Sequence, residues 1–336
     1  MKASPPPTVM RLVRTIGILL AGFLIAVFCG ISVGSSGGSL FSILPVLMGK
    51  SNPDSMLHAI VWQIRLPRVL LAALVGAALS VGGLVFQALL RNLLAEPYIL
   101  GISGGSAIGA IVGILLGFAR FPGVSLAAFA GSMATLALIL VMTSGPSLLK
   151  KESLLLSGVM VNAFCSAVIM FLISVTRDAE LHNIIFWLMG DLSSGDISQV
   201  GILTVLLLPC FVIIFVFSHP MNLLLMGREM AQATGINIKV VSVILLVGTS
   251  FMVSATVSYC GLIGFVGLVM PHLLRLLLGP DHRILVPACL LGGGAYLVVC
   301  DLLARTLPQQ GEMPAGVITA IIGAPLFIAL LKKSGK

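Results

Sequence analysis

The chain has 336 residues, of which 58% are hydrophobic and only 9% are charged, and its mean hydropathy is +1.16. Soluble domains carry about 25% charged residues, so this composition excludes a soluble globular protein with an ordinary hydrated surface. The formal net charge is +8, but the basic residues do not gather into a stripe, which argues against nucleic-acid binding.

Long apolar runs dominate the chain. Backbone exposed to lipid must satisfy its own hydrogen bonds, so uninterrupted apolar runs of about 17–25 residues predict transmembrane helices. The alternating pattern of a β-barrel is absent. We therefore predict an all-α integral membrane protein, a single transmembrane domain over residues 1–336, with about ten transmembrane helices. The predicted spans are 14–33, 68–90, 98–117, 124–144, 154–175, 197–217, 240–259, 262–278, 284–303 and 314–331.

The first span resembles a signal peptide in its basic start. However, Phe28 precedes Cys29 where a cleavage site would need a small residue, and nine further spans follow, so we expect the span to be retained. With the N-terminus inside, 13 of the 19 Lys and Arg residues fall on the cytoplasmic side and 6 fall outside. This asymmetry predicts that the N- and C-termini are both cytoplasmic.

Basic residues at the outer ends of two spans are candidate binding groups. Arg65 and Arg68 lie one helical turn apart at the start of the second span, so both can face outward and fork onto carboxylates. Anchoring of this span at lipid headgroups is an equally good interpretation. Arg305 ends the ninth span on the same side, and Asp301 four residues earlier is placed to pair with it.

Glycines recur at every fourth position of the third span. Such a stripe favours close helix packing, although a role in lining a path at a dimer interface stays open. The stripe consists of Gly101, Gly105, Gly109, Gly113 and Gly117. A second feature is the external segment from Leu181 to Asp191, which contains Trp187 and suits a half-helix at the membrane interface.

The sequence holds no catalytic signature. Met48–Ser51 resembles the end of a phosphate-binding loop, but Leu44 stands where that loop needs glycine. The six cysteines are scattered, with no CxxC or Cys/His pairing, so neither a metal site nor a disulfide is expected. Every Asp and Glu lies near a predicted membrane surface, whereas an ion-coupled transporter would place a carboxylate near the midplane. We therefore expect neither an enzyme nor a cofactor, and an energy source outside the chain.

The segment Met226–Asn237 is polar and helix-capable between two apolar spans, which indicates a docking element for a soluble partner. Together with this element, three motifs resemble the iron-chelate and cobalamin permease family, the membrane subunits of type II ABC importers. The motifs are Arg65–Arg68, Gln87–Pro97 and Gly261–His272, and Gly323–Phe327 in the last span continues the likeness.

The resemblance implies a type II ABC importer permease fold in the bacterial cytoplasmic (inner) membrane. It also implies a homodimer with the path at the subunit interface, two cytoplasmic ATP-binding subunits, and one periplasmic or lipid-anchored binding protein. From it we expect an iron chelate (siderophore or haem) as substrate, with cobalamin as the alternative. A stand-alone secondary transporter and a membrane-embedded enzyme are weaker alternatives, and co-purification with an ATPase would separate them.

The resemblance also implies roles for individual residues. It implies that Arg65, Arg68 and Arg305 bind the substrate-binding protein. Coupling helices at about 220–238 would contact the ATPase, and the implied coupling residues are Gly227, Arg228, Glu229, Met230, Ala233 and Gly235. The implied cytoplasmic gate consists of Asn92, Leu93, Leu94 and Ser147, with Leu93 standing where the family usually has proline.

Overall fold

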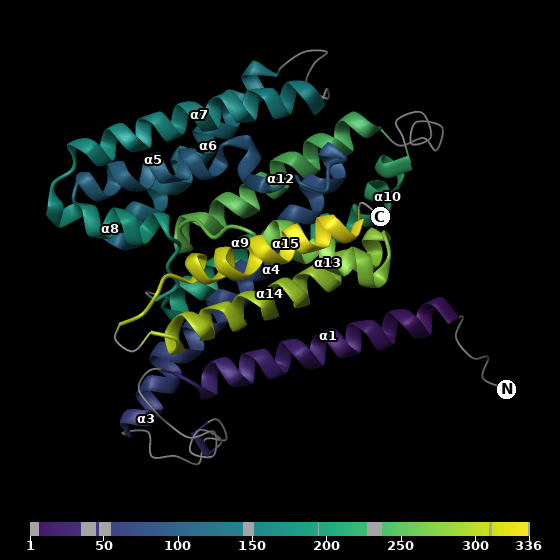
Figure 1. The fold of residues 1–336 in the computed structure, drawn as a ribbon, viewed down its shortest axis with the longest axis horizontal. Helices are drawn as coiled ribbons and strands as arrows, with labels where there is room; N and C mark the ends of the chain where they lie inside the picture. Colours follow the sequence, from purple (N-terminus) through teal and green to yellow (C-terminus); the bar gives the residue numbers. More distant parts are fainter. Residues whose placement is uncertain are drawn as a thin grey trace.

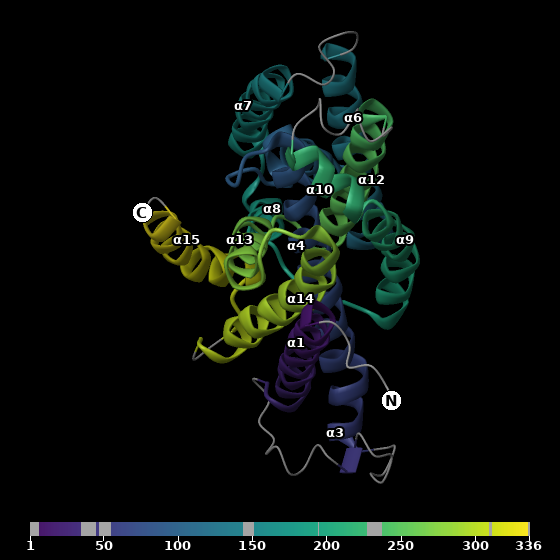
Figure 2. The same ribbon diagram turned by 90° about the vertical axis from the view of Figure 1, so that its right-hand side faces the viewer.

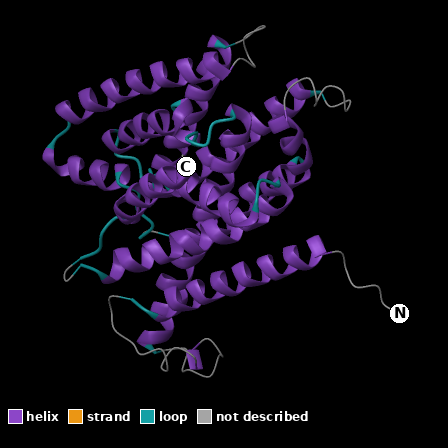
Figure 3. Cartoon of the chain, turned by 45° about the vertical axis from the view of Figure 1, so that its right-hand side comes forward, coloured by secondary structure: helices purple, strands orange, loops and turns teal. Residues whose placement is uncertain are grey.

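The structure, a computed structural model, describes residues 7–34, 45–46, 55–143, 151–193, 195–226, 237–308 and 311–334. The elements within these ranges are helices, and Figure 3 shows no strand among them. In chain order they are α1 (Pro7–Ser32), α3 (Met56–Ala59), η1 (Ile60–Arg65), α4 (Leu66–Leu90), η2 (Pro97–Leu100), α5 (Ile102–Leu115), η3 (Arg120–Val124), α6 (Ser125–Met142), α7 (Lys151–Val175), α8 (Asp178–Leu188), α9 (Ile197–Val216), α10 (Ser218–Met226), α12 (Ile238–Cys260), α13 (Val266–Leu278), α14 (His282–Thr306) and α15 (Ala315–Ser334).

The predicted spans are confirmed as helices. In the described part of the chain, 7 helices are long and apolar enough to cross a membrane. Three shorter apolar helices, Ile102–Leu115, Val266–Leu278 and Ala315–Leu330, match the remaining predicted spans. The predicted external half-helix is also helical, as α8, and begins at Asp178 instead of Leu181.

The third and eighth spans begin later than predicted, because the backbone turns where the apolar run continues. Gly101 (φ 68°) precedes α5 and Phe265 (φ 68°) precedes α13, and both are left-handed. The resulting helices have 14 and 13 residues, about 20 Å at 1.5 Å per residue, which is shorter than a hydrocarbon core of about 30 Å.

Irregular backbone at membrane depth needs protein partners for its polar groups. The two breaks supply these partners to each other. The Tyr98 hydroxyl donates to the Ile263 carbonyl (3.0 Å) and accepts from the Ile263 amide (3.2 Å). Nearby, the Asp191 amide donates to the Cys260 carbonyl at 2.8 Å, which joins the end of α12 to the segment after α8.

Helix α4 lies at the centre of the molecule and contacts α1, α9, α10, α12, α13 and α14. Glycines allow the closest approaches: a Cβ on Gly76 would overlap the backbone of Gly293 in α14, and a Cβ on Gly83 would overlap the backbone of Gly267 in α13. Figures 1 and 2 both place α1 on one flank of this centre and α6 and α7 on the opposite flank.

The glycines predicted as one helical stripe divide into two groups. Gly105 and Gly109 lie in α5 so close to α6 that a Cβ on either would overlap α6 atoms, and a Cβ on Gly113 would lie 3.2 Å from the Cβ of Ala127 in α6. Gly101 (φ 68°) and Gly117 (φ 72°) lie outside α5 as left-handed residues, so the stripe is shorter than the sequence predicts.

The ends of the helices define two faces. Figure 1 shows α3 and α8 toward the left-hand end of the molecule and α10 and the C-terminal end of α15 toward the right-hand end. The α10 end is the one that the charge asymmetry assigns to the cytoplasm. The arginines predicted to lie outside therefore belong to the opposite end.

Candidate functional site

The three arginines predicted for docking meet at the outer end of the molecule, where η1, the start of α4 and the end of α14 come together. Arg68 binds Asp301 through Nε (2.9 Å to Oδ1) and through Nη2 (2.9 Å to Oδ1). Arg305 binds the other oxygen of the same carboxylate at 3.0 Å, which confirms the predicted i,i+4 pair. Arg65 donates to the carbonyls of Ile31 (3.2 Å) and Ser32 (3.1 Å) at the end of α1.

This arginine cluster (Arg65, Arg68, Asp301, Arg305 and Glu312) is buried on its inner side. The three arginines are only 3–4% exposed and Asp301 is 0% exposed. Arg68 also contacts Glu312, on the connection between α14 and α15, at 2.5 Å through Nη1. Three guanidinium groups and two carboxylates leave one positive charge among these five side chains. The sequence placed the arginines on one side and predicted the pair of Arg305 and Asp301, but it did not show that Arg68 binds both Asp301 and Glu312.

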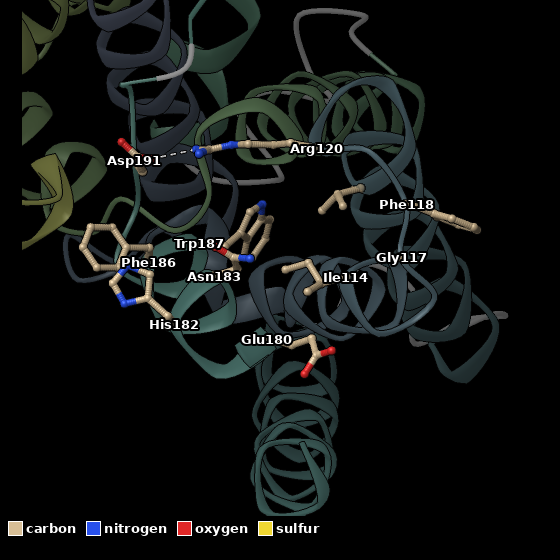
Figure 4. Close-up of a pocket in the computed structure, with 11 residues that line it drawn as sticks. Ile114, Gly117, Phe118, Arg120, Glu180, His182, Asn183, Phe186, Trp187 and Asp191 are labelled. Atoms are coloured by element: carbon tan, nitrogen blue, oxygen red, sulfur yellow. Dashed lines mark hydrogen bonds and ion pairs between the residues drawn. The ribbon is translucent and has the colours of Figure 1, made fainter. Parts of the chain in front are cut away.

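A second feature at the same end is a cavity of about 520 Å³ between α5, η3 and α8. Figure 4 shows the Arg120 side chain reaching across to Asp191, and the two groups form an ion pair at 2.8 Å. Trp187 and Asn183 line the same cavity, and one buried oxygen of Glu180, Oε2, has no hydrogen-bond partner among the described residues. The cavity can accept a small polar group.

The charge state of Asp191 determines whether Arg120 stays bound on the opposite side of this cavity. Burial alone would raise the pKa of Asp191, but hydrogen bonds from Ser193 and Arg120 and the charge of Arg120 outweigh burial and lower it. The carboxylate therefore stays ionised and holds Arg120 across the cavity.

The predicted gate residues Asn92, Leu93 and Leu94 form a turn directly after α4. Arg91 ends the helix in a left-handed conformation (φ 46°), and the Asn92 side chain accepts a hydrogen bond from the Leu94 amide at 2.9 Å. Leu93 and Leu94 are 39% and 47% exposed. Glu96 follows them half-buried, and burial raises its pKa to about 7.

A polar bridge on the cytoplasmic side ties α10 to the start of α14. Asn222 Nδ2 donates to Asp281 Oδ1 at 2.7 Å, and Asn222 Oδ1 accepts from the His282 backbone amide at 2.9 Å and lies 2.7 Å from His282 Nδ1. Burial alone would raise the pKa of Asp281, but hydrogen bonds from Arg283 and Asn222 lower it to about 2. Helix α10 covers residues 220–226 of the predicted coupling region at about 220–238.

Part of the predicted site lies outside the described residues. This applies to the coupling residues Gly227, Arg228, Glu229, Met230, Ala233 and Gly235, and to the gate residue Ser147. Within the described ranges, no group of three or more His, Cys, Asp and Glu side chains is placed to hold a metal ion.

Comparison with known protein families identifies the family of this chain. The model of the FecCD transport family matches residues 19–333. The chain belongs to the FecCD transport family. A FecCD permease of this kind is a multi-pass membrane subunit of a bacterial ABC importer, and it is not itself an enzyme. It works with an ATPase and a binding protein.

Individual relatives of this FecCD permease are similar over most of its length. It is 42% identical over 278 residues to the vitamin B12 import system permease protein BtuC of Salmonella arizonae, covering 82% of this chain and 84% of the relative. It is 40% identical over 276 residues to the protein of the same name from Salmonella typhi, with the same coverage of 82% and 84%.

Solved structures confirm the fold. A metal-chelate type ABC transporter in an inward-facing conformation superposes with a TM-score of 0.85 at 30% identity, covering 95% of this chain and 99% of the other. PsaBC from Streptococcus pneumoniae, at 17% identity and a TM-score of 0.55, shares the fold over 79% of this chain and 90% of its own.

Sequence reasoning missed Glu312, Asn222, Tyr98 and the cavity residue Arg120. Asp281 carried a usable signal, because an Asp directly before an apolar helix predicts an N-cap, and the structure shows that its side chain accepts from the Arg283 amide. The others had no local signal, since their partners lie 59 or more residues away.

Proposed function

We propose that this FecCD permease is the membrane subunit of a cobalamin importer. The observation that supports this substrate is the identity of 40–42% to vitamin B12 permeases over 82% of the chain. The iron chelate expected from the sequence rested only on the frequency of such substrates in the family. It remains the second candidate because of the likeness to a metal-chelate type transporter at 30% identity.

Both candidates are intact metal chelates, and the chemistry of the described residues favours that class over a bare ion. A bare transition-metal ion needs imidazole, thiolate or carboxylate ligands in a cluster, and the described part of the chain presents no such cluster. A chelate carries its own ligands, so an apolar path without strong donors lets it pass without binding tightly.

In the proposed mechanism a binding protein docks at the outer end through carboxylates that pair with the arginine cluster. An ATPase contacts the cytoplasmic end next to α10, and the Asn222 bridge carries its movement to α14. Nucleotide binding then shifts a dimer of two permease copies between outward-open and inward-open arrangements. Exposed apolar side chains on α7, including Met160, Phe164 and Phe171, are available to lipid and to a second copy.

Uptake in proteoliposomes tests this proposal. The permease is reconstituted with its ATPase and binding protein, and uptake of labelled cyanocobalamin, ferric siderophore and haem is compared with and without ATP. We expect ATP-dependent uptake of cyanocobalamin only. Uptake of a ferric siderophore or haem instead would overturn the substrate and keep the importer class. Uptake of any of these by the permease alone would contradict the requirement for an ATPase.

A further inference from the structure

Arg68 has two carboxylate partners that differ in their surroundings. Asp301, 0% exposed in its side chain, binds Arg68 from the inside, while Glu312, 37% exposed, binds Arg68 from the outside. The inner contact uses Nε and Nη2, and the outer contact uses Nη1. Arg68 therefore presents one guanidinium nitrogen, Nη1, toward the exposed side, and Glu312 occupies it.

This arrangement determines which contact a partner protein can replace. Opening the buried pair of Arg68 and Asp301 would leave the fully buried Asp301 with Arg305 as its remaining ion-pair partner, and breaking a buried ion pair is strongly unfavourable. The contact with Glu312 is half-exposed, and exposed ion pairs contribute little to stability. An incoming carboxylate can therefore exchange with Glu312 at little net cost, whereas it cannot exchange with Asp301.

The position of Glu312 links this exchange to a transmembrane helix. The next residue, Met313, donates its amide to the Ala304 carbonyl of α14 at 3.2 Å. Helix α15 begins at Ala315, and the Gly316 amide reaches the Gly190 carbonyl at 3.4 Å after α8. Releasing Glu312 would remove the side-chain contact that ties this connection to α4, directly beside the backbone bond that holds it to α14.

We propose that Glu312 is an internal competitor for the docking site: it occupies Arg68 in the free permease, and a carboxylate of the binding protein displaces it on docking. This inference rests on the proposed docking role of the arginine cluster. It reconciles that role with arginines that are only 3–4% exposed. The proposal requires an acidic partner surface, which would complement the one excess positive charge of the cluster.

The test measures binding-protein affinity for the permease–ATPase complex in lipid nanodiscs by biolayer interferometry. The probe is the binding protein that supports uptake in the reconstituted system. Glu312→Gln keeps the side-chain shape and removes the competing charge, so affinity should rise up to about fivefold, the scale of an exposed ion pair. Asp178→Asn is the matched control: it removes one exposed charge in the first turn of α8, a helix that Figure 1 shows toward the same end of the molecule, and affinity should change much less.

A Glu312→Gln affinity equal to or weaker than that of the parent would overturn the proposal. Equal increases in both variants would overturn it too, since the effect would then be one of overall charge. Glu312→Asp, which keeps the charge but shortens the side chain, provides a second measurement if Glu312→Gln assembles poorly, and affinity should again rise. If the binding protein does not bind the parent permease–ATPase complex at all, the proposed function itself is refuted. That result differs from a failure of the Glu312 proposal, in which the parent binds and Glu312→Gln does not bind more tightly.

Discussion

Asp301 holds the arginine cluster together, and its removal should destabilise the protein far more than removal of Glu312. In Asp301→Ala, Arg68 loses the acceptor of two nitrogens and Arg305 loses its ion pair at 3.0 Å, while both guanidinium groups stay 4% exposed. Leaving a buried charge unpaired costs about 3–5 kcal/mol. Glu312→Ala removes a half-exposed partner, so its cost should be about 0–1 kcal/mol.

The difference can be measured by SDS-induced unfolding of the purified permease in mixed micelles, followed by tryptophan fluorescence. Trp62 lies in η1 next to the cluster, so it reports on this region. The double variant Arg68→Ala with Asp301→Ala should be less destabilised than the sum of the single variants, because the two groups interact. If the loss of unfolding free energy in Asp301→Ala is within about 1 kcal/mol of the loss in Glu312→Ala, the assignment of Asp301 as the buried partner is wrong.

Three further predictions address the core, the cytoplasmic bridge and the gate. Gly83→Ala should destabilise the permease by about 1–3 kcal/mol or more, whereas Gly248→Ala, with nothing within 4 Å of its Cβ, should be neutral or stabilising in the same SDS titration. Asn222→Ala leaves His282 and Asp281 short of partners, so we expect a loss of about 1–3 kcal/mol and ATP hydrolysis with reduced uptake; normal uptake per ATP would contradict the bridge. For Glu96, whose pKa of about 7 exceeds the ordinary 4.5, the folded state holds an extra proton, so stability falls as pH rises from 4.5 to 7. Glu96→Gln should lack this slope in unfolding curves taken between these pH values, and a parallel decline in both proteins would exclude the shift.

Hydropathy predicts the spans because lipid imposes a minimum apolar length, and that signal is read locally along the chain. Because hydropathy is read locally, it does not predict where α5 and α13 begin. Gly101 and Phe265 turn the backbone within a continuous apolar run, and no window of composition detects a change of φ. Basic residues at Arg65, Arg68 and Arg305 predict the outer end, because topology depends on where charges stand relative to the spans, and the structure brings these residues to one end of the molecule.

The long-range polar contacts of the structure are of a different kind, because they depend on where distant parts of the chain meet. Arg68 meets Glu312 across 244 residues, and Tyr98 meets Ile263 across 165 residues. Each pair satisfies polar groups that would otherwise be costly in an apolar interior, yet each half of a pair looks like an ordinary surface residue or turn residue in sequence. Apolar length therefore fixes how many helices cross the membrane, while sparse long-range polar pairs fix how their ends are joined. In this permease those joined ends carry the groups proposed to meet the binding protein and the ATPase.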